Sequence, residues 1–178
     1  QAEVEDGGSS FTACWGDVDN DGNLDLLVTD GVTGDGTPNR LYRNGGQGGF
    51  TDLAPEAGIR PGRSIGSAFG DYDNDGDLDL YIVNFNSVNS FYRNDTDSRK
   101  GEVRFTDVTR ETRTQLPLGG HFAFFFDYDN DGNLDLFCSE LSDYETTLYS
   151  KLNGYTRSDR NRPDLYRNEG DGHFEDRN

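Results

Sequence analysis

One aspartate-rich phrase occurs three times in this chain and constrains its fold more than any other feature. It reads DVDNDGNLDL at Asp17–Leu26, DYDNDGDLDL at Asp71–Leu80 and DYDNDGNLDL at Asp127–Leu136, a period of about 55 residues. Self-similarity at such a period indicates a repeat architecture in which each unit is one supersecondary block. Residues 1–178 therefore read as a single array of three units, at about 1–54, 55–109 and 110–178.

Other features keep the same phase as the aspartate phrase. An aromatic residue lies two positions before each phrase, and an L/F-Y-R-N word and then a Phe follow it. The segments around the second phrase, SIGSAFG and LDLYIVN, are short and alternating, which is typical of strands. Each unit therefore predicts four short antiparallel strands, with the aspartate phrase as the loop between strands one and two. The expected fold class is all-β, built of β-propeller blades.

The number of units leaves the closure of the array open. Three blades are fewer than the four to eight of a typical closed propeller. Uncovered sheet edges invite pairing. They would be covered by further blades outside this chain, by association of copies, or by an unusual closure of the three blades on themselves. The third unit also carries an insertion at about 139–163, between its strands two and three, which we expect to be a surface excursion.

The aspartates follow the pattern D-x-D-x-D-G-x-x-D, which is typical of a metal-binding loop. Alternate residues of a tight loop can turn their carboxylates toward one point, and the Gly at position six permits a sharp bend with positive φ. Position seven would offer its backbone carbonyl, and position nine a chelating carboxylate. The predicted metal ligands are Asp17, Asp19, Asp21, Asn23 and Asp25; Asp71, Asp73, Asp75, Asp77 and Asp79; and Asp127, Asp129, Asp131, Asn133 and Asp135.

Calcium is the ion that these loops predict, with about three ions per chain. Hard oxygen ligands in this number suit calcium, whereas magnesium demands a stricter octahedron and zinc prefers His or Cys. The loop is not an EF-hand, because position twelve falls inside a strand, where an EF-hand has a bidentate Glu. An acidic solvated turn, the alternative, does not account for Asp at all twelve of positions one, three, five and nine.

The charge of the chain limits its partners. It carries 34 acidic and 16 basic residues, a net charge of −18. Such a field repels nucleic acid and anionic membranes, so we expect neither as a partner. No apolar stretch approaches the length of about 18 residues that a transmembrane helix needs, so membrane insertion is not expected. No signal-peptide pattern opens the chain, and the lack of Met favours a processed chain or a piece of a longer one.

These motifs resemble the FG-GAP/VCBS repeat family, best known from the propeller head of integrin α chains. Phe69-Gly70-Asp71 matches the FG word, and DYDNDGDLDLYIVN matches the calcium loop and the strand after it. Together with LYRNGGQGGFTDLAPEAG, they look more specifically similar to the acidic cartilage protein group and its bacterial relatives. The first unit departs from the FG word with Trp15-Gly16, and the third with Phe125-Phe126, which lacks the glycine.

The resemblance implies a calcium-binding propeller in an extracellular or secreted setting, the cell surface or the periplasm included. It implies structural or adhesive roles more often than catalysis. No nucleophile, base or cofactor loop is recognisable in the sequence, so we do not expect an enzyme. The two cysteines, Cys14 and Cys138, are either buried free thiols or a disulfide. Asn94 opens the sequon Asn94-Asp95-Thr96, in a turn that would expose it for glycosylation.

The sequence therefore predicts a calcium-binding extracellular module with a structural, adhesive or assembly role and a protein or polysaccharide partner. One alternative is a glycan-binding module, or the non-catalytic propeller part of a carbohydrate-active enzyme, with Tyr144, Tyr149 and Tyr155 stacking on sugars. Another is a self-assembling subunit of a filament or ring, a homo-oligomer. We expect the repeated arginines to pair with nearby carboxylates at blade edges, with a ligand clamp as the alternative: Arg43, Arg93 and Arg167.

Overall fold

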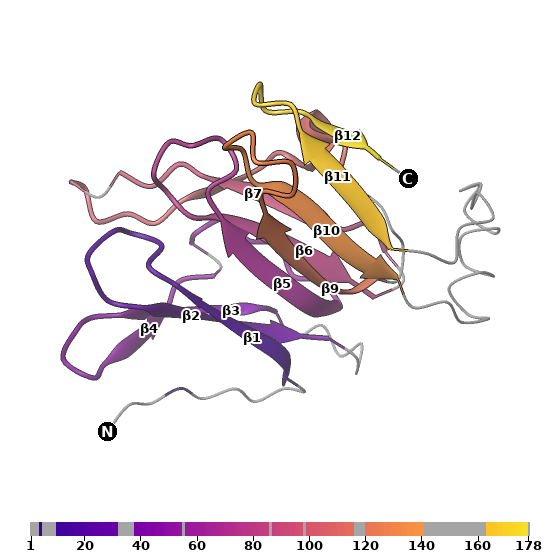
Figure 1. Ribbon diagram of the computed structural model, residues 1–178. Helices are drawn as coiled ribbons and strands as arrows, with labels where there is room; N and C mark the ends of the chain where they lie inside the picture. The colour runs from indigo at the N-terminus through magenta and orange to yellow at the C-terminus, as the bar shows by residue number, and fades with distance from the viewer. Residues whose placement is uncertain are drawn as a thin grey trace.

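Three four-stranded antiparallel sheets make up the described part of the chain (Figure 1). The computed structural model describes residue 4 and residues 10–31, 38–54, 56–85, 87–97, 99–115, 120–140 and 163–177. The first sheet contains β1 (Ser10–Gly16), β2 (Asp25–Asp30), β3 (Arg40–Asn44) and β4 (Phe50–Asp52). The second contains β5 (Ser64–Gly70), β6 (Asp79–Asn84), β7 (Ser90–Asn94) and β8 (Phe105–Asp107). The third contains β9 (Gly120–Phe126), β10 (Asp135–Glu140), β11 (Asp164–Asn168) and β12 (Phe174–Asp176).

The expected all-β fold is confirmed, and the three sheets are consistent with propeller blades. Within each sheet the strands pair in chain order, and each strand is antiparallel to its neighbour. One helical turn, α1 (Thr109–Thr112), follows the second sheet. None of the helical residues that the structure describes forms a segment long and apolar enough to cross a bilayer. Residues 141–162, most of the predicted insertion, lie outside the described part of the chain.

The sheets lie face to face, with their first strands side by side. Strand β5 contacts both β1 and β9 (Figure 1). The middle sheet therefore has both faces covered, and every residue of β6 is buried. Because side chains alternate along a strand, Leu80 and Ile82 enter the core shared with the first sheet, whereas Tyr81 and Val83 enter the core shared with the third. The two cores between sheets contain most of the buried apolar side chains.

Each sheet thus has a forward face, toward the next sheet in the chain, and a rear face. The forward face of the first sheet and the rear face of the second form the first core, which includes Leu27, Leu41, Leu80 and Tyr92. The forward face of the second sheet and the rear face of the third form the second core, which includes Phe91, Leu136, Cys138 and Tyr166. The rear face of the first sheet carries a smaller cluster of Leu26, Val28, Tyr42 and, partly buried, Phe50.

Candidate metal centre

The aspartate phrases form the loops between the first and second strands of the sheets, as the sequence predicts. In every loop the Gly at position six has positive φ, between 89° and 94°. The Asn at position four also has positive φ, between 56° and 60°, at Asn20, Asn74 and Asn130. Asn is among the few non-glycine residues that tolerate this region, since its short polar side chain can bond locally. The two left-handed residues turn the chain back on itself, so that the aspartates surround a small volume.

The first aspartate of each loop closes the turn. Oδ1 of Asp17 accepts the backbone N–H of Asp21 at 3.0 Å, and Oδ2 accepts that of Gly22 at 2.8 Å. Asp71 and Asp127 accept the equivalent pairs of N–H groups at 3.0–3.1 Å. A carboxylate has about four lone-pair sites, so these bonds leave each oxygen able to contact a cation.

The ninth residue of each loop joins the loop to the third strand. Asp25 is fully buried; its Oδ2 accepts the N–H of Val18 at 2.9 Å and its Oδ1 that of Asn44 at 2.8 Å. The same two bonds form at Asp79 and Asp135. The carboxylate therefore ties together the loop and strands two and three of its own sheet.

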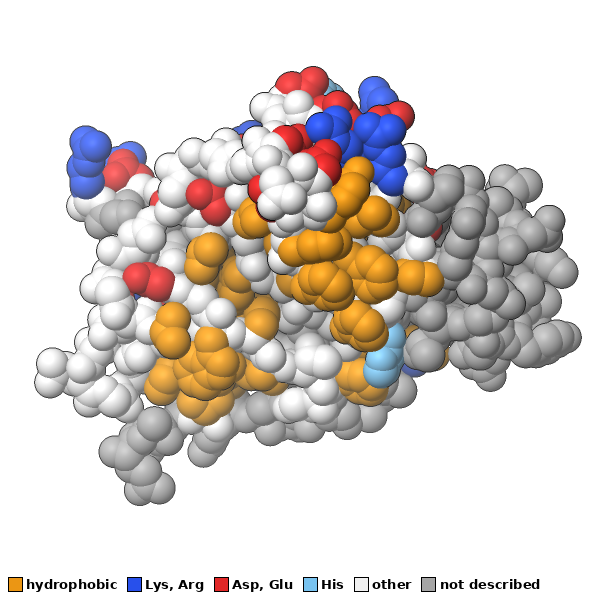
Figure 2. Space-filling model, viewed as in Figure 1, with side chains coloured by type: hydrophobic (Ala, Val, Ile, Leu, Met, Phe, Trp, Pro, Cys, Tyr) orange, Lys and Arg blue, Asp and Glu red, His pale blue; other side chains and the backbone are white. Residues whose placement is uncertain are grey.

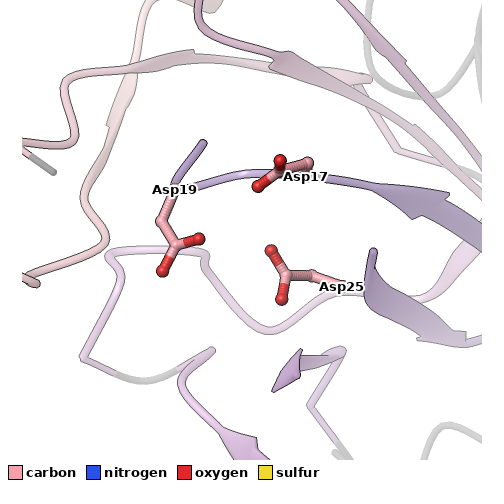
Figure 3. Close-up of side chains that lie close together, drawn as sticks. All are labelled: Asp17, Asp19 and Asp25. Carbon is pink, nitrogen blue, oxygen red and sulfur yellow. The ribbon is translucent and has the colours of Figure 1, made fainter. Parts of the chain in front are cut away.

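Carboxylates at positions one, three and nine converge in all three loops. The groups are Asp17, Asp19 and Asp25; Asp71, Asp73 and Asp79; and Asp127, Asp129 and Asp135, each with ligand oxygens within 4.8 Å of one another. Figure 3 shows the first of these triads, with its three carboxylates gathered around a common space. Three like charges this close repel strongly at low dielectric, so each triad provides an environment that favours a cation.

Positions five and seven lie outside these triads. The carboxylates at position five, Asp21, Asp75 and Asp131, each accept the N–H of the residue at position seven at 2.8–2.9 Å. The side chains at position seven of the later loops face the preceding loop: Asn20 Nδ2 donates to Asp77 Oδ1 at 2.6 Å, and Asn74 Nδ2 to Asn133 Oδ1 at 3.1 Å. The position-seven side chains therefore connect neighbouring loops.

Burial and mutual repulsion shift the titration of the buried carboxylates. Burial raises the pKa of Asp79 to about 8, and the charges of Asp73 and Asp75 add to the increase. Burial also raises the pKa of Asp25 and of Asp135 above the ordinary value. A carboxyl group in such surroundings stays ionised at neutral pH when a cation compensates its charge.

Two of the three repeated arginines form ion pairs with aspartates of the metal loops. The sequence predicted pairing with nearby carboxylates but not that the partners would be loop aspartates. Arg43 Nη2 lies 2.5 Å from Asp19 Oδ2, at position three of the first loop. Arg167 Nε lies 2.6 Å from Asp129, at position three of the third loop, and its Nη2 lies 2.8 Å from Asp131. In the second sheet Arg93 instead pairs with Asp95 at 2.8 Å. The expected pairing with nearby carboxylates is therefore present, but in two sheets the partner belongs to the metal loop.

The donor set fits a hard cation. All nine triad residues are aspartates, so the available ligand atoms are oxygens, which Ca²⁺ prefers. The side chain of Asp19 is only 2% exposed; its Oδ2 forms the ion pair with Arg43, and its Oδ1 accepts no hydrogen bond from the described residues. Because a buried carboxylate is costly without a compensating charge, Arg43 already supplies at Asp19 part of the positive charge that a bound cation would supply.

The structure corrects the predicted exposure of Asn94. Its side chain is 1% exposed, and its Nδ2 donates to the carbonyls of Val18 at 2.9 Å and Leu78 at 3.1 Å. In the third sheet, Asn168 Nδ2 makes the equivalent bonds, to the carbonyl of Tyr72 in the second aspartate loop and to the carbonyl of Leu134 in its own loop. The amide nitrogen that a glycan would modify is thus occupied between two sheets of the folded chain, and it is not presented in a turn.

The two cysteines are free thiols in different cores. Cys14 packs against the first core, where its Sγ lies 3.1 Å from the hydroxyl of Ser67, and burial raises its pKa to about 11. Cys138 is fully buried in the second core. The second sheet separates them, so of the two alternatives left by the sequence the structure has the free thiols, buried at Cys138 and half-buried at Cys14. The three tyrosines proposed to stack on sugars, Tyr144, Tyr149 and Tyr155, lie outside the described residues.

Comparison with known proteins agrees with the repeat assignment. A family model described as an FG-GAP-like repeat matches residues 17–82 and again 71–138. Cartilage acidic protein 1 from Homo sapiens is 30% identical over 119 residues, which cover 65% of this chain and 17% of the human protein. The Mus musculus protein of the same name is also 30% identical over 119 residues, and the Xenopus tropicalis protein is 29% identical over 109 residues. The matched region thus spans less than a fifth of the length of each relative.

Proposed function

Because the chain belongs to the FG-GAP-like repeat family, we propose that it is a calcium-binding repeat module in which each aspartate loop holds one ion. The observation that carries this proposal is the threefold recurrence of the same carboxylate triad at the same hairpin. The buried Oδ1 of Asp19, which accepts no hydrogen bond from the described residues, is compatible with it. Acidic clusters are common on protein surfaces, but a chance cluster would not keep one geometry through three separate sheets.

The carboxylates at positions one, three and nine would hold the ion. A bound calcium ion would compensate the negative charge that each triad brings together. The chain's own contribution is to fix the ligands in advance, since the first and ninth carboxylates are already positioned by backbone N–H groups. Such pre-positioning lowers the cost of ordering the site when the ion binds.

We propose a structural or adhesive role outside the cytoplasm, without catalysis. Each triad aspartate serves as a loop-closing acceptor, a strand-linking acceptor or a cation ligand, which leaves none of the triads assigned to a reaction. Extracellular calcium modules bind in the 10⁻⁴–10⁻³ M range, and exposed, acidic hairpin loops suit such moderate affinity. The relatives carry the words cartilage and acidic in their names, and this chain, at a net charge of −18, is acidic as well.

Calorimetric titration and thermal melting test the proposal. Adding calcium to the chelator-treated chain should give binding heat for three ions and raise the melting temperature, because ligand binding to the folded state stabilises it by mass action. Asp73→Asn removes one triad carboxylate and should leave two ions. The matched control, Asp97→Asn, removes an exposed acid that pairs with Lys100 outside the triads and should leave three. Absence of binding heat together with an unchanged melting temperature would refute the proposal.

A further inference from the structure

The aspartate loops of neighbouring sheets are in direct contact through their side chains. The three loops lie side by side at one end of the sheets (Figure 1). At position four of the first loop, Asn20 Nδ2 donates to Asp77 Oδ1 of the second loop at 2.6 Å and to the carbonyl of Gly76 at 3.4 Å. At position four of the second loop, Asn74 Nδ2 donates to Asn133 Oδ1 of the third loop at 3.1 Å. Position four of each of these two loops therefore bonds to position seven of the next loop.

Position seven is also the place where the loop pattern predicts a backbone carbonyl ligand. Its own loop holds it through the backbone, because the position-five carboxylate accepts its N–H: Asp75 accepts that of Asp77 at 2.9 Å, and Asp131 accepts that of Asn133 at 2.9 Å. The preceding loop holds it through the side chain. A change in the preceding loop is therefore passed to a residue of the next ion site.

A second, buried connection joins the same loops. The backbone N–H of Asn94 donates to Asp79 Oδ1 at 2.8 Å, and its Nδ2 donates to the carbonyl of Val18 at 2.9 Å. Val18 stands at position two of the first loop, between two triad aspartates. Asn168 makes the same pair of bonds, to the ninth carboxylate of the third loop and to position two of the second loop. One asparagine thus fixes each pair of neighbouring ion sites relative to each other.

The three ion sites have no triad ligand in common. Each triad belongs to one loop, and Figure 2 shows the acidic side chains along this end of the molecule in separate groups, with uncharged atoms between them. An ion held by one triad is therefore not held by the triad of the next loop. Its effect on the neighbouring site passes through the two kinds of hydrogen-bond connection and through its charge.

We propose, as an extension that rests on the proposed calcium binding, that the three loops bind calcium cooperatively, with Asn20 and Asn74 as positioning residues for the ion of the next loop. An ion that orders one loop also fixes the amide that holds position seven of the next loop. The next ion then meets a site that has already lost part of its freedom, so its binding costs less conformational entropy. Linkage makes the effect reciprocal, so two neighbouring loops favour each other by the same factor.

Calorimetric titration of the full chain with calcium tests this coupling. Asn20→Gly/Asn74→Gly removes both connecting amides, and Gly tolerates the positive φ of 56° and 59° at these positions. A coupling of about 5-fold, lost at two junctions and spread over three ions, should raise the calcium midpoint by about 3-fold or more. The Hill coefficient should fall below the wild-type value. Salt at about 0.3 M in every titration screens charges that lie more than about 8 Å apart, which limits direct repulsion between the ions.

The third loop supplies the matched control. Asn130 has the same position and a φ of 60°, but its side chain bonds to no other loop in the described part of the chain. Asn130→Gly should therefore leave the midpoint and the Hill coefficient unchanged. Asp73→Asn supplies a second control, because it keeps the middle loop empty; in that background the double glycine variant should shift the midpoint of the two remaining ions less than it does in the wild-type background. Urea unfolding in calcium-free buffer checks that each variant folds.

Three results would overturn the coupling and leave calcium binding itself intact. The first is a double glycine variant that binds three ions with the wild-type midpoint and Hill coefficient. The second is an Asn130→Gly chain whose midpoint shifts as much as that of the double variant, since the effect would then lie within each loop. The third is a shift by the double variant that is undiminished in the Asp73→Asn background. A wild-type chain that gives no binding heat with calcium would overturn both the coupling and the proposed function.

Discussion

Removal of one side-chain amide should show how firmly the sheets are joined. Asn168→Ala deletes the Nδ2 group that donates to the buried carbonyl of Tyr72 in the preceding sheet at 2.7 Å and to Leu134 at 3.1 Å. A buried acceptor left without its partner costs about 1–3 kcal/mol, and the second bond adds about 0.5–1.5 kcal/mol. We therefore expect the free energy of unfolding to fall by about 2–4 kcal/mol.

The first sheet supplies the matched control, because Asn44 stands in the same Y-R-N word and its Nδ2 has no hydrogen bond to another sheet of the described residues. Its Nδ2 donates to the exposed carbonyl of Leu24 at 3.1 Å, which water can solvate after the substitution. Asn44→Ala should cost about 1 kcal/mol or less. The residues L-Y-R-N are the same at both sites, so effects on the unfolded chain largely cancel in the comparison.

Urea-induced unfolding in saturating calcium measures both values, with the dependence on urea concentration checked for each variant. Equal losses for Asn44→Ala and Asn168→Ala would refute the reasoning, because they would mean that the bond across sheets contributes nothing beyond the local turn. A loss below about 0.5 kcal/mol for Asn168→Ala would do the same.

Three further predictions concern the loops and the sheet contacts. Arg167→Gln should raise the calcium affinity of the third loop in a calorimetric titration, since it frees two loop carboxylates. Arg93→Gln should change the affinity of the second loop less, because the ion pair of Arg93 is with Asp95 and Asp73 feels only its more distant charge. Burial raises the pKa of Asp79 to about 8, so in calcium-free buffer the folded chain should bind this proton more tightly than the unfolded chain does. The free energy of unfolding should therefore fall as the pH rises from about 4 to about 8, by at most about 1.4 kcal/mol per pH unit. Asp79→Asn should flatten that slope in urea unfolding at several pH values. Gly70→Ala should cost about 1–3 kcal/mol by overpacking in urea unfolding, and Gly49→Ala, where an added Cβ meets nothing, should cost less.

The repeat period and the alternation of side chains were sufficient to predict the sheets. Leu80 and Ile82 alternate with Tyr81 and Val83, and all four are apolar or aromatic, which is what a strand covered on both faces requires. The loops were predictable for a similar reason. Their shape depends on residues within nine positions of one another, and the turn residues specify the bend locally.

Contacts between distant segments could not be predicted in this way. The sequence suggested an exposed turn at Asn94, but the side chain bonds to Val18, 76 residues away, because the second sheet docks on the first loop. The partner of Arg43 likewise depends on β3 lying beside the loop that holds Asp19. Neither contact leaves a local signal, although the recurrence of Arg and Asn in the Y-R-N word of every unit showed that these positions have a common structural task.

The three loops share nearly identical letters but differ in their charge balance, and the difference lies at position three. Asp19 and Asp129 each face an arginine of their own sheet, whereas Arg93 is paired with Asp95, which the longer turn after β7 provides. The second loop is also the one with Asp at position seven, and burial raises the pKa of its Asp73. Its negative charge is therefore the least compensated by the protein itself. A cation binding to the array should enter the second loop first, because there it displaces no guanidinium and relieves the most repulsion.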